Sequence, residues 1–124
     1  MEEKKVFQLM DPIPKGKEKK EWKITINVPF LNCNRIHPLQ QNKIAYIVDN
    51  LKSDKNINKI IIFGSSVTDQ CHVGSDVDLF VQQNDKKKVQ MPLCDFPFDL
   101  WTNYSVDSGM FDEIKEKGVT VYEK

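Results

Sequence analysis

Two carboxylates, Asp76 and Asp78, stand two residues apart at the start of an apolar run that continues to Val81. If this run is a strand, its side chains alternate between two faces, so both acids lie on the same face. Two adjacent carboxylates repel each other, and bringing them together is costly unless a cation neutralises them. The pair therefore predicts a metal site, and hard carboxylate oxygens favour magnesium.

A third carboxylate is expected on a neighbouring strand. The run DFPFDLW alternates, which places Phe98 and Leu100 on one face and both Asp95 and Asp99 on the other. We favour Asp99 over Asp95, because its apolar neighbours match the residues that flank Asp78. Adjacent strands lie ~4.8 Å apart and alternate residues on one strand ~6.6 Å apart, so the three acids can form one cluster.

A glycine-serine turn precedes the acids in the sequence. Gly64, Ser65 and Ser66 end a run of β-branched residues, and Ser75 directly precedes the first acid. Glycine lets the backbone approach a phosphate closely, and the amides at a helix start favour an anion. We therefore expect Gly64 and Ser65 to face the phosphates of a nucleotide, with Ser66 and Ser75 as further candidate nucleotide-binding residues.

The periodicity of apolar residues predicts the elements that position these side chains. We expect strands over 22–30, 57–63, 76–82, 95–101 and 119–122, and helices over 38–52, 67–71 and 109–117. This order predicts an α+β fold in which helices pack on a small mixed sheet. We expect residues 1–30 to form an N-terminal arm with an extra strand, and residues 31–124 to form the functional domain.

Composition restricts the functions that the chain can have. Its 18 basic and 18 acidic residues cancel, so there is no global field to attract a nucleic acid or a membrane surface. Between Lys59 and Lys86 there are acids but no Lys or Arg, which suits a site that recruits a metal ion. Three cysteines without paired spacing predict reduced thiols in a cytoplasmic protein, and no apolar run approaches membrane-spanning length.

Taken together, the motifs resemble those of the DNA polymerase β-type nucleotidyltransferase superfamily. The shared pattern is an apolar residue, Gly-Ser, about ten further residues and then Asp-x-Asp with apolar neighbours. Within the superfamily the chain is most similar to the small stand-alone minimal nucleotidyltransferases. The matching pieces are FGS (63–65), GSDVDLFV (74–81), FDLW (98–101) and IKEKGVTVYEK (114–124). The resemblance covers residues 38–124 and implies a nucleotidyltransferase fold.

The resemblance implies a role for each motif residue. Asp76 and Asp78 would bind one or two magnesium ions, and Asp99 would be a third ligand and the general base. Gly64 and Ser65 would hold the phosphates of the nucleoside triphosphate. The expected enzyme is a magnesium-dependent nucleotidyltransferase that moves a nucleoside monophosphate, AMP from ATP, to a hydroxyl of a protein or an RNA.

The acceptor and the partner follow from the resemblance alone. Relatives of this size often act as antitoxins that nucleotidylate a HEPN-type helical protein, which implies a hetero-complex; a homodimer is the other assembly that we consider. Two other functions remain open. One is a catalytically degenerate binding module, favoured by the lack of a positive charge in residues 66–69. The other is transfer to a small molecule of the aminoglycoside kind.

Overall fold

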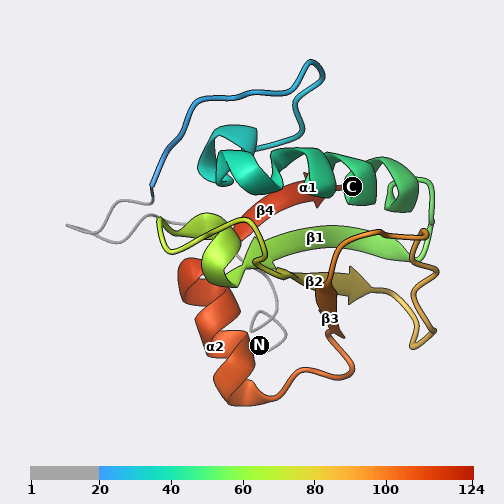
Figure 1. Cartoon of the computed structure of the whole chain (residues 1–124). Coiled ribbons are helices and arrows are strands. Elements are labelled where there is room, and N and C mark those ends of the chain that lie inside the picture. Colours follow the sequence, from blue (N-terminus) through green and yellow to red (C-terminus); the bar gives the residue numbers. More distant parts are fainter. Residues whose placement is uncertain (1–19) are drawn as a thin grey trace.

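Four strands form one mixed sheet in the computed structural model, which describes residues 20–124 (Figure 1). The strand order is β3-β2-β1-β4. Strand β1 pairs antiparallel with β2 and with β4, whereas β2 and β3 are parallel. The strands are β1 (Ile57–Phe63), β2 (Val77–Gln83), β3 (Phe98–Thr102) and β4 (Val119–Glu123). The predicted α+β class with a mixed sheet is confirmed.

Helix α1 (Pro38–Leu51) covers one face of this sheet (Figure 1). It begins where predicted: Pro38 occupies the first turn, and the His37 side chain caps it by accepting a hydrogen bond from the Leu39 amide at 3.1 Å. The predicted apolar stripe is buried and packs with alternate residues of β1 and β2. Its members are Ile44, Ile47, Val48 and Leu51.

Helix α2 (Ser108–Lys117) covers part of the opposite face. Asp107 caps it, because its carboxylate accepts a hydrogen bond from the Met110 amide at 2.8 Å. Phe111 and Ile114 are buried against the second face of β1 and β2, and the rings of Phe80 and Phe111 lie 5.9 Å apart. The central strand β1 is therefore covered on both faces, as its continuous β-branched run predicts.

The strand predicted over 22–30 is wrong. This segment crosses α1 as irregular chain, with Val28 80% exposed and Ile24 40% exposed, so its alternating pattern does not mark a buried face. Instead of a strand partner, the buried Gln41 side chain holds it, accepting from the Thr25 amide at 2.8 Å and donating to the Lys23 carbonyl at 2.9 Å. The arm predicted over residues 1–19 lies outside the described residues.

Two further boundaries differ from prediction by more than one residue. The turn after β1 is a 3-10 helix, η3 (Gly64–Val67), rather than a helix over 67–71, because Gly64 has a φ of 77° and turns the chain as soon as β1 ends. Strand β3 starts at Phe98 rather than at residue 95, since Pro97 has no N–H to donate to a ladder. A second 3-10 turn, η2 (Cys33–Arg35), leads into α1.

Within residues 20–124, no helix is both long enough and apolar enough to span a membrane. Cys33, Cys71 and Cys94 are free thiols, as their spacing predicts.

The close contact between α2 and β1 at Gly118 can be tested. A Cβ at this position would overlap the Ile114 carbonyl oxygen and the Ile61 side chain, so Gly118→Ala should lower the free energy of unfolding by about 1–3 kcal/mol through overpacking. Urea denaturation followed by circular dichroism measures this. Gly109→Ala is the matched control, because a Cβ there would meet only a side-chain oxygen at 3.7 Å. An equal free energy of unfolding for the two variants would contradict the close packing at Gly118.

Candidate functional site

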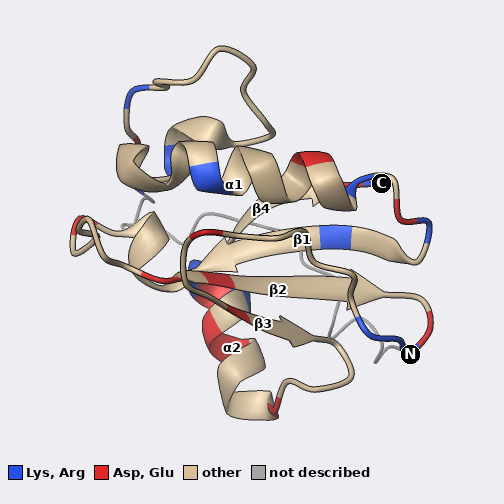
Figure 2. Ribbon diagram, turned by 45° about the vertical axis from the view of Figure 1, so that its right-hand side comes forward, with Lys and Arg blue, Asp and Glu red and all other residues tan. Residues whose placement is uncertain are grey.

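The parallel pairing of β2 with β3 brings two of the predicted acids side by side. Asp78 is the register partner of Asp99, and paired residues of neighbouring strands project from the same face. Asp76 lies two residues before Asp78, at the entrance to β2. Asp78 is half-buried, whereas Asp76 and Asp99 are exposed. In Figure 2, acidic residues gather where β2, β3 and α2 meet.

The environment of Asp78 disfavours its charged form. Burial, together with the negative charges of Asp99, Asp76 and Glu113, raises the pKa of the Asp78 carboxyl from 3.8 to about 6. Glu113 lies on α2, and no sequence motif marked it as part of this cluster. Since like charges raise the pKa here, a divalent cation near Asp78 would remove an existing repulsion.

The glycine-serine turn packs directly on this carboxylate. Phe63 is the register partner of Asp78, so Gly64 leaves the sheet next to that acid. A Cβ on Gly64 would overlap Asp78 Oδ2, and the φ of 77° is one that residues with a side chain rarely adopt. Glycine is therefore required at position 64 both by its conformation and by the close approach of the acid.

The three serines have different surroundings. Ser65 is partly exposed beside Gly64, so both remain accessible to a ligand. Ser66 is fully buried and its hydroxyl oxygen accepts a hydrogen bond from Gln40 at 3.1 Å. The buried Ser75 hydroxyl oxygen accepts a hydrogen bond from the His72 amide at 2.9 Å. Ser66 and Ser75 thus stabilise their loops from within, and the structure does not direct them at a ligand.

Gln40, which sequence analysis missed, joins the two halves of the site. Its fully buried side-chain amide lies 3.1 Å from Ser66 Oγ and 3.3 Å from each of the carbonyl oxygens of Ser75 and Asp76. Helix α1 is thereby bonded to the glycine-serine turn and to the entrance of β2 through one side chain. The Gln40 Oε1 atom is buried without a hydrogen-bond partner among the described residues. No signal in the sequence distinguishes Gln40 from its neighbour Gln41.

Asp95 does not join the acids. It is exposed on the segment that precedes β3, where it lines a pocket together with residues of α1. Asp99, by contrast, is paired with Asp78. Asp95 and Asp99 were both predicted to face the same way, and the structure brings Asp99 next to Asp78.

The donor set suits magnesium only in part. Carboxylate oxygens are the ligands that magnesium prefers, and the raised pKa of Asp78 reflects its burial first and the neighbouring negative charges second. Within residues 20–124, however, no three or more His, Cys, Asp or Glu side chains are arranged to hold a metal ion on their own. Magnesium usually keeps several waters and takes substrate phosphates as ligands, so one or two carboxylates fit such a shared site.

Comparison with known proteins gives one family. A family model described as "Polymerase beta, Nucleotidyltransferase" matches residues 42–124, a range that contains Gly64, Asp76, Asp78 and Asp99. No curated protein matches the chain.

Replacing Asp78 should stabilise the metal-free protein. The raised pKa means that the ionised carboxylate destabilises the folded state; this cost is absent below pH 3.8 and fully present above about pH 6. In a fully buried group this pKa rise would correspond to about 3 kcal/mol of lost folding stability. The partial exposure of Asp78 reduces the expected loss to about 1–2 kcal/mol. Asp78→Asn should therefore raise the free energy of unfolding at pH 8 by that amount, measured by urea denaturation with a chelator present.

The pH dependence separates this cause from an unspecific gain. The difference between wild type and Asp78→Asn should shrink as the pH falls from 8 to 4. The exposed Asp112→Asn variant serves as the control. A stability gain that is the same at pH 4 and pH 8 would contradict the electrostatic explanation.

Adjacent glutamines offer a test of the Gln40 bridge. Gln40→Met removes the donor shared by Ser66 and the two carbonyls, so it should lower the free energy of unfolding by about 1–2 kcal/mol and abolish stabilisation by magnesium. Gln41→Met should destabilise comparably, because Gln41 is equally buried, but it should retain the response to magnesium. Thermal unfolding with and without magnesium chloride measures both effects. The same magnesium response in both variants would show that Gln40 has only a structural role.

Proposed function

This chain belongs to the polymerase beta family of nucleotidyltransferases, and on that premise we propose that it transfers a nucleoside monophosphate from a magnesium-bound nucleoside triphosphate, ATP, to a hydroxyl group. The observation that carries the proposal is the register that sets Asp78 beside Asp99, with Gly64 packed on Asp78. The acceptor that we propose is a HEPN-type helical protein or an RNA, the classes that the resemblance to minimal nucleotidyltransferases implies.

Each acid of the cluster has a proposed role that agrees with its exposure. Asp76 and Asp78 would hold magnesium together with waters and phosphate oxygens of the substrate, and Asp99, paired with Asp78, would lie beside the ion. When bound, the ion would neutralise charge on the phosphates and on the attacking oxygen. Gly64 and Ser65 would place backbone next to the phosphates, because the turn has no side chain at the position closest to Asp78.

Asp99 is the acid best placed to receive a proton. It is exposed on the edge strand β3, where an acceptor hydroxyl can reach it, whereas Asp78 is half-buried. In the proposed reaction the hydroxyl oxygen forms a bond to the α-phosphorus, and the bond from that phosphorus to the pyrophosphate oxygen breaks. The hydroxyl proton passes to Asp99, and pyrophosphate leaves. Positioning and electrostatic stabilisation would supply most of the acceleration.

A second candidate function is a binding module that has lost catalysis. Two observations favour it: residues 66–69 carry no positive charge, and the described acids do not form a closed three-ligand group. Such a protein would act by occupying a partner, and its acids would then contribute nothing to binding.

Labelled ATP and magnesium test the proposed activity directly. With a candidate protein or RNA acceptor, wild type should transfer label from the α-phosphate, and Asp78→Asn or Asp99→Asn should reduce the rate at least 100-fold, because ligands and base act only through their carboxylates. Asp85→Asn, an exposed acid outside the cluster, should retain the wild-type rate.

Two outcomes would count against this assignment. Equal transfer by Asp78→Asn and wild type would place the chemistry elsewhere. No transfer by wild type with any of the four nucleoside triphosphates, together with unchanged partner binding by the Asp76→Asn, Asp78→Asn double variant, would favour the binding module.

A further inference from the structure

Strand β3, which carries Asp99, forms one edge of the sheet (Figure 2). The Val77 amide donates a hydrogen bond to the Pro97 carbonyl at 3.1 Å, and this bond fixes which residues of β3 form the parallel ladder with β2. In such a ladder the backbone groups of alternate residues point toward the partner strand. Those of Asp99 therefore point at β2, whereas those of Phe98 and Leu100 point away from the sheet.

The outer side of β3 is open. Within residues 20–124, no group outside the ladder with β2 forms a hydrogen bond with the backbone of Phe98 or Leu100. The opposite edge strand, β4, differs, because the Asn32 side chain donates a hydrogen bond to the Thr120 carbonyl at 2.8 Å. Exposed N–H and C=O groups at a sheet edge can pair with a further strand. Strand β3 is therefore the edge that can accept one.

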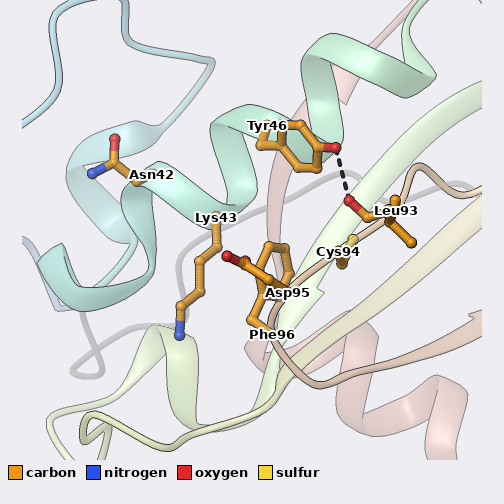
Figure 3. Close-up of a pocket in the computed structure, with 7 residues that line it drawn as sticks. All are labelled: Asn42, Lys43, Tyr46, Leu93, Cys94, Asp95 and Phe96. Atoms are coloured by element: carbon orange, nitrogen blue, oxygen red, sulfur yellow. Dashed lines mark hydrogen bonds between the residues drawn. The ribbon is translucent and has the colours of Figure 1, made fainter.

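The two faces of β3 would present different surfaces to an added strand. On the α1 face, Phe98 and Leu100 are only partly buried against the core. The pocket between α1 and the segment 93–96 also lies on that face, and none of the clustered acids lines it (Figure 3). On the α2 face, Asp99 is exposed beside Asp78. An added strand would thus meet apolar side chains on one face and the proposed base on the other.

An antiparallel strand added at this edge would bring one of its residues directly opposite Asp99. Because the backbone groups of Asp99 point at β2, this pair would be of the non-hydrogen-bonded kind, with Cα atoms ~4.5 Å apart and the side chains close together. Opposed residues share a face, so a short serine or threonine side chain would place its hydroxyl beside the carboxylate. Gly64 lies on the other side of Asp78, so hydroxyl and phosphates would approach that acid from opposite sides.

The charges around Asp99 distinguish between acceptor classes. Asp76, Asp78 and Glu113 lie near it, and residues 60–85 contain no Lys or Arg. An RNA carries a negative charge on each phosphate and would be repelled by these acids. A peptide segment with Lys or Arg would be attracted to them. Charge complementarity therefore favours a basic protein segment over an RNA.

We propose that β3 binds an extended segment of an acceptor protein as an additional antiparallel strand, and that a serine or threonine opposite Asp99 receives the nucleotide. The residues on either side of it would be apolar, because they would pair with Phe98 and Leu100. In the transfer, the hydroxyl oxygen bonds to the α-phosphorus of ATP, the hydroxyl proton passes to Asp99, and pyrophosphate leaves. This inference rests on the proposed function, because it specifies the acceptor of the same reaction.

Amide hydrogen exchange of the full chain, followed by nuclear magnetic resonance, tests the edge. In the free protein, the Phe98 and Leu100 amides should exchange quickly and the Asp99 and Trp101 amides slowly, because only the latter two point at β2. The capped peptide Lys-Lys-Val-Ser-Val-Lys-Lys, at saturating concentration, should slow exchange at Phe98 and Leu100 at least ten-fold and leave β4 unchanged. Slow exchange at both positions without peptide would show that another part of the chain or a second copy covers the edge, which would overturn the proposal.

Peptides methylated on one backbone nitrogen separate strand pairing from other modes of binding. In the proposed antiparallel pair, the valine N–H groups would point at β3 and the serine N–H group would point away from it. Methylation of one valine nitrogen should therefore weaken binding about ten-fold in calorimetry, whereas methylation of the serine nitrogen should change the affinity less than about two-fold. Equal losses for the two peptides would contradict strand addition.

Transfer of label from the α-phosphate of ATP, with magnesium present, connects the edge to the reaction. The serine peptide should be labelled, and the same peptide with alanine in place of serine should not. A single-stranded RNA should receive at least ten-fold less label than the serine peptide, because its phosphates meet the acids around Asp99.

The possible failures are distinguishable. Label on the RNA but not on the peptide, or unchanged exchange at β3 with saturating peptide, would overturn the strand assignment and leave the proposed function in place. Peptide bound at β3, without transfer to the peptide, to RNA or to any other acceptor, would contradict the proposed function and support β3 as a docking edge.

Discussion

The side-chain amide of Gln40 is the contact on which the arrangement of the site depends. It bonds α1 to Ser66 in the turn after β1 and to the entrance of β2 at Ser75, two points with eight residues between them. Without this amide, the Ser75 and Asp76 carbonyls and the Ser66 hydroxyl would lose a buried donor. A helix whose buried residues are otherwise apolar, apart from Gln41, thus controls the relative position of a polar loop and a pair of acids.

The acid cluster opposes the stability that the core supplies. Apolar packing on both faces of β1 and β2 holds the strands in register, and this register places Asp78 beside Asp99. Burial of Asp78, together with repulsion from the neighbouring acids, raises the pKa of its carboxyl to about 6. Such a cluster persists only where the surrounding structure determines it, which is common where function needs it. The two helices therefore stabilise a local arrangement that is unfavourable on its own.

Periodicity predicted most of the fold, because α1, α2, β1, β2 and β4 each bury one side or both. It failed for the segment around Ile24, which alternates in sequence but does not pair with a strand of the sheet. The Gln41 side chain makes hydrogen bonds to its backbone instead. Parity placed Asp76 and Asp78 on one face, and the apolar residues that flank Asp99 favoured it over Asp95 as the third acid. Sequence patterns did not mark Gln40 or Glu113 as part of the site. Their contributions depend on how α1 and α2 pack on the sheet, and local sequence does not reveal that packing.

Parallel pairing of β2 and β3 has a topological consequence. Two parallel neighbours require a crossover that returns the chain to its starting end, and here residues 84–97 perform it without a helix. The returning half of this crossover is also the wall of the pocket beside α1. This one linker therefore affects two positions: that of Asp99 beside Asp78, and that of Phe96 beside α1. An insertion or deletion in residues 84–97 would therefore disturb the two together.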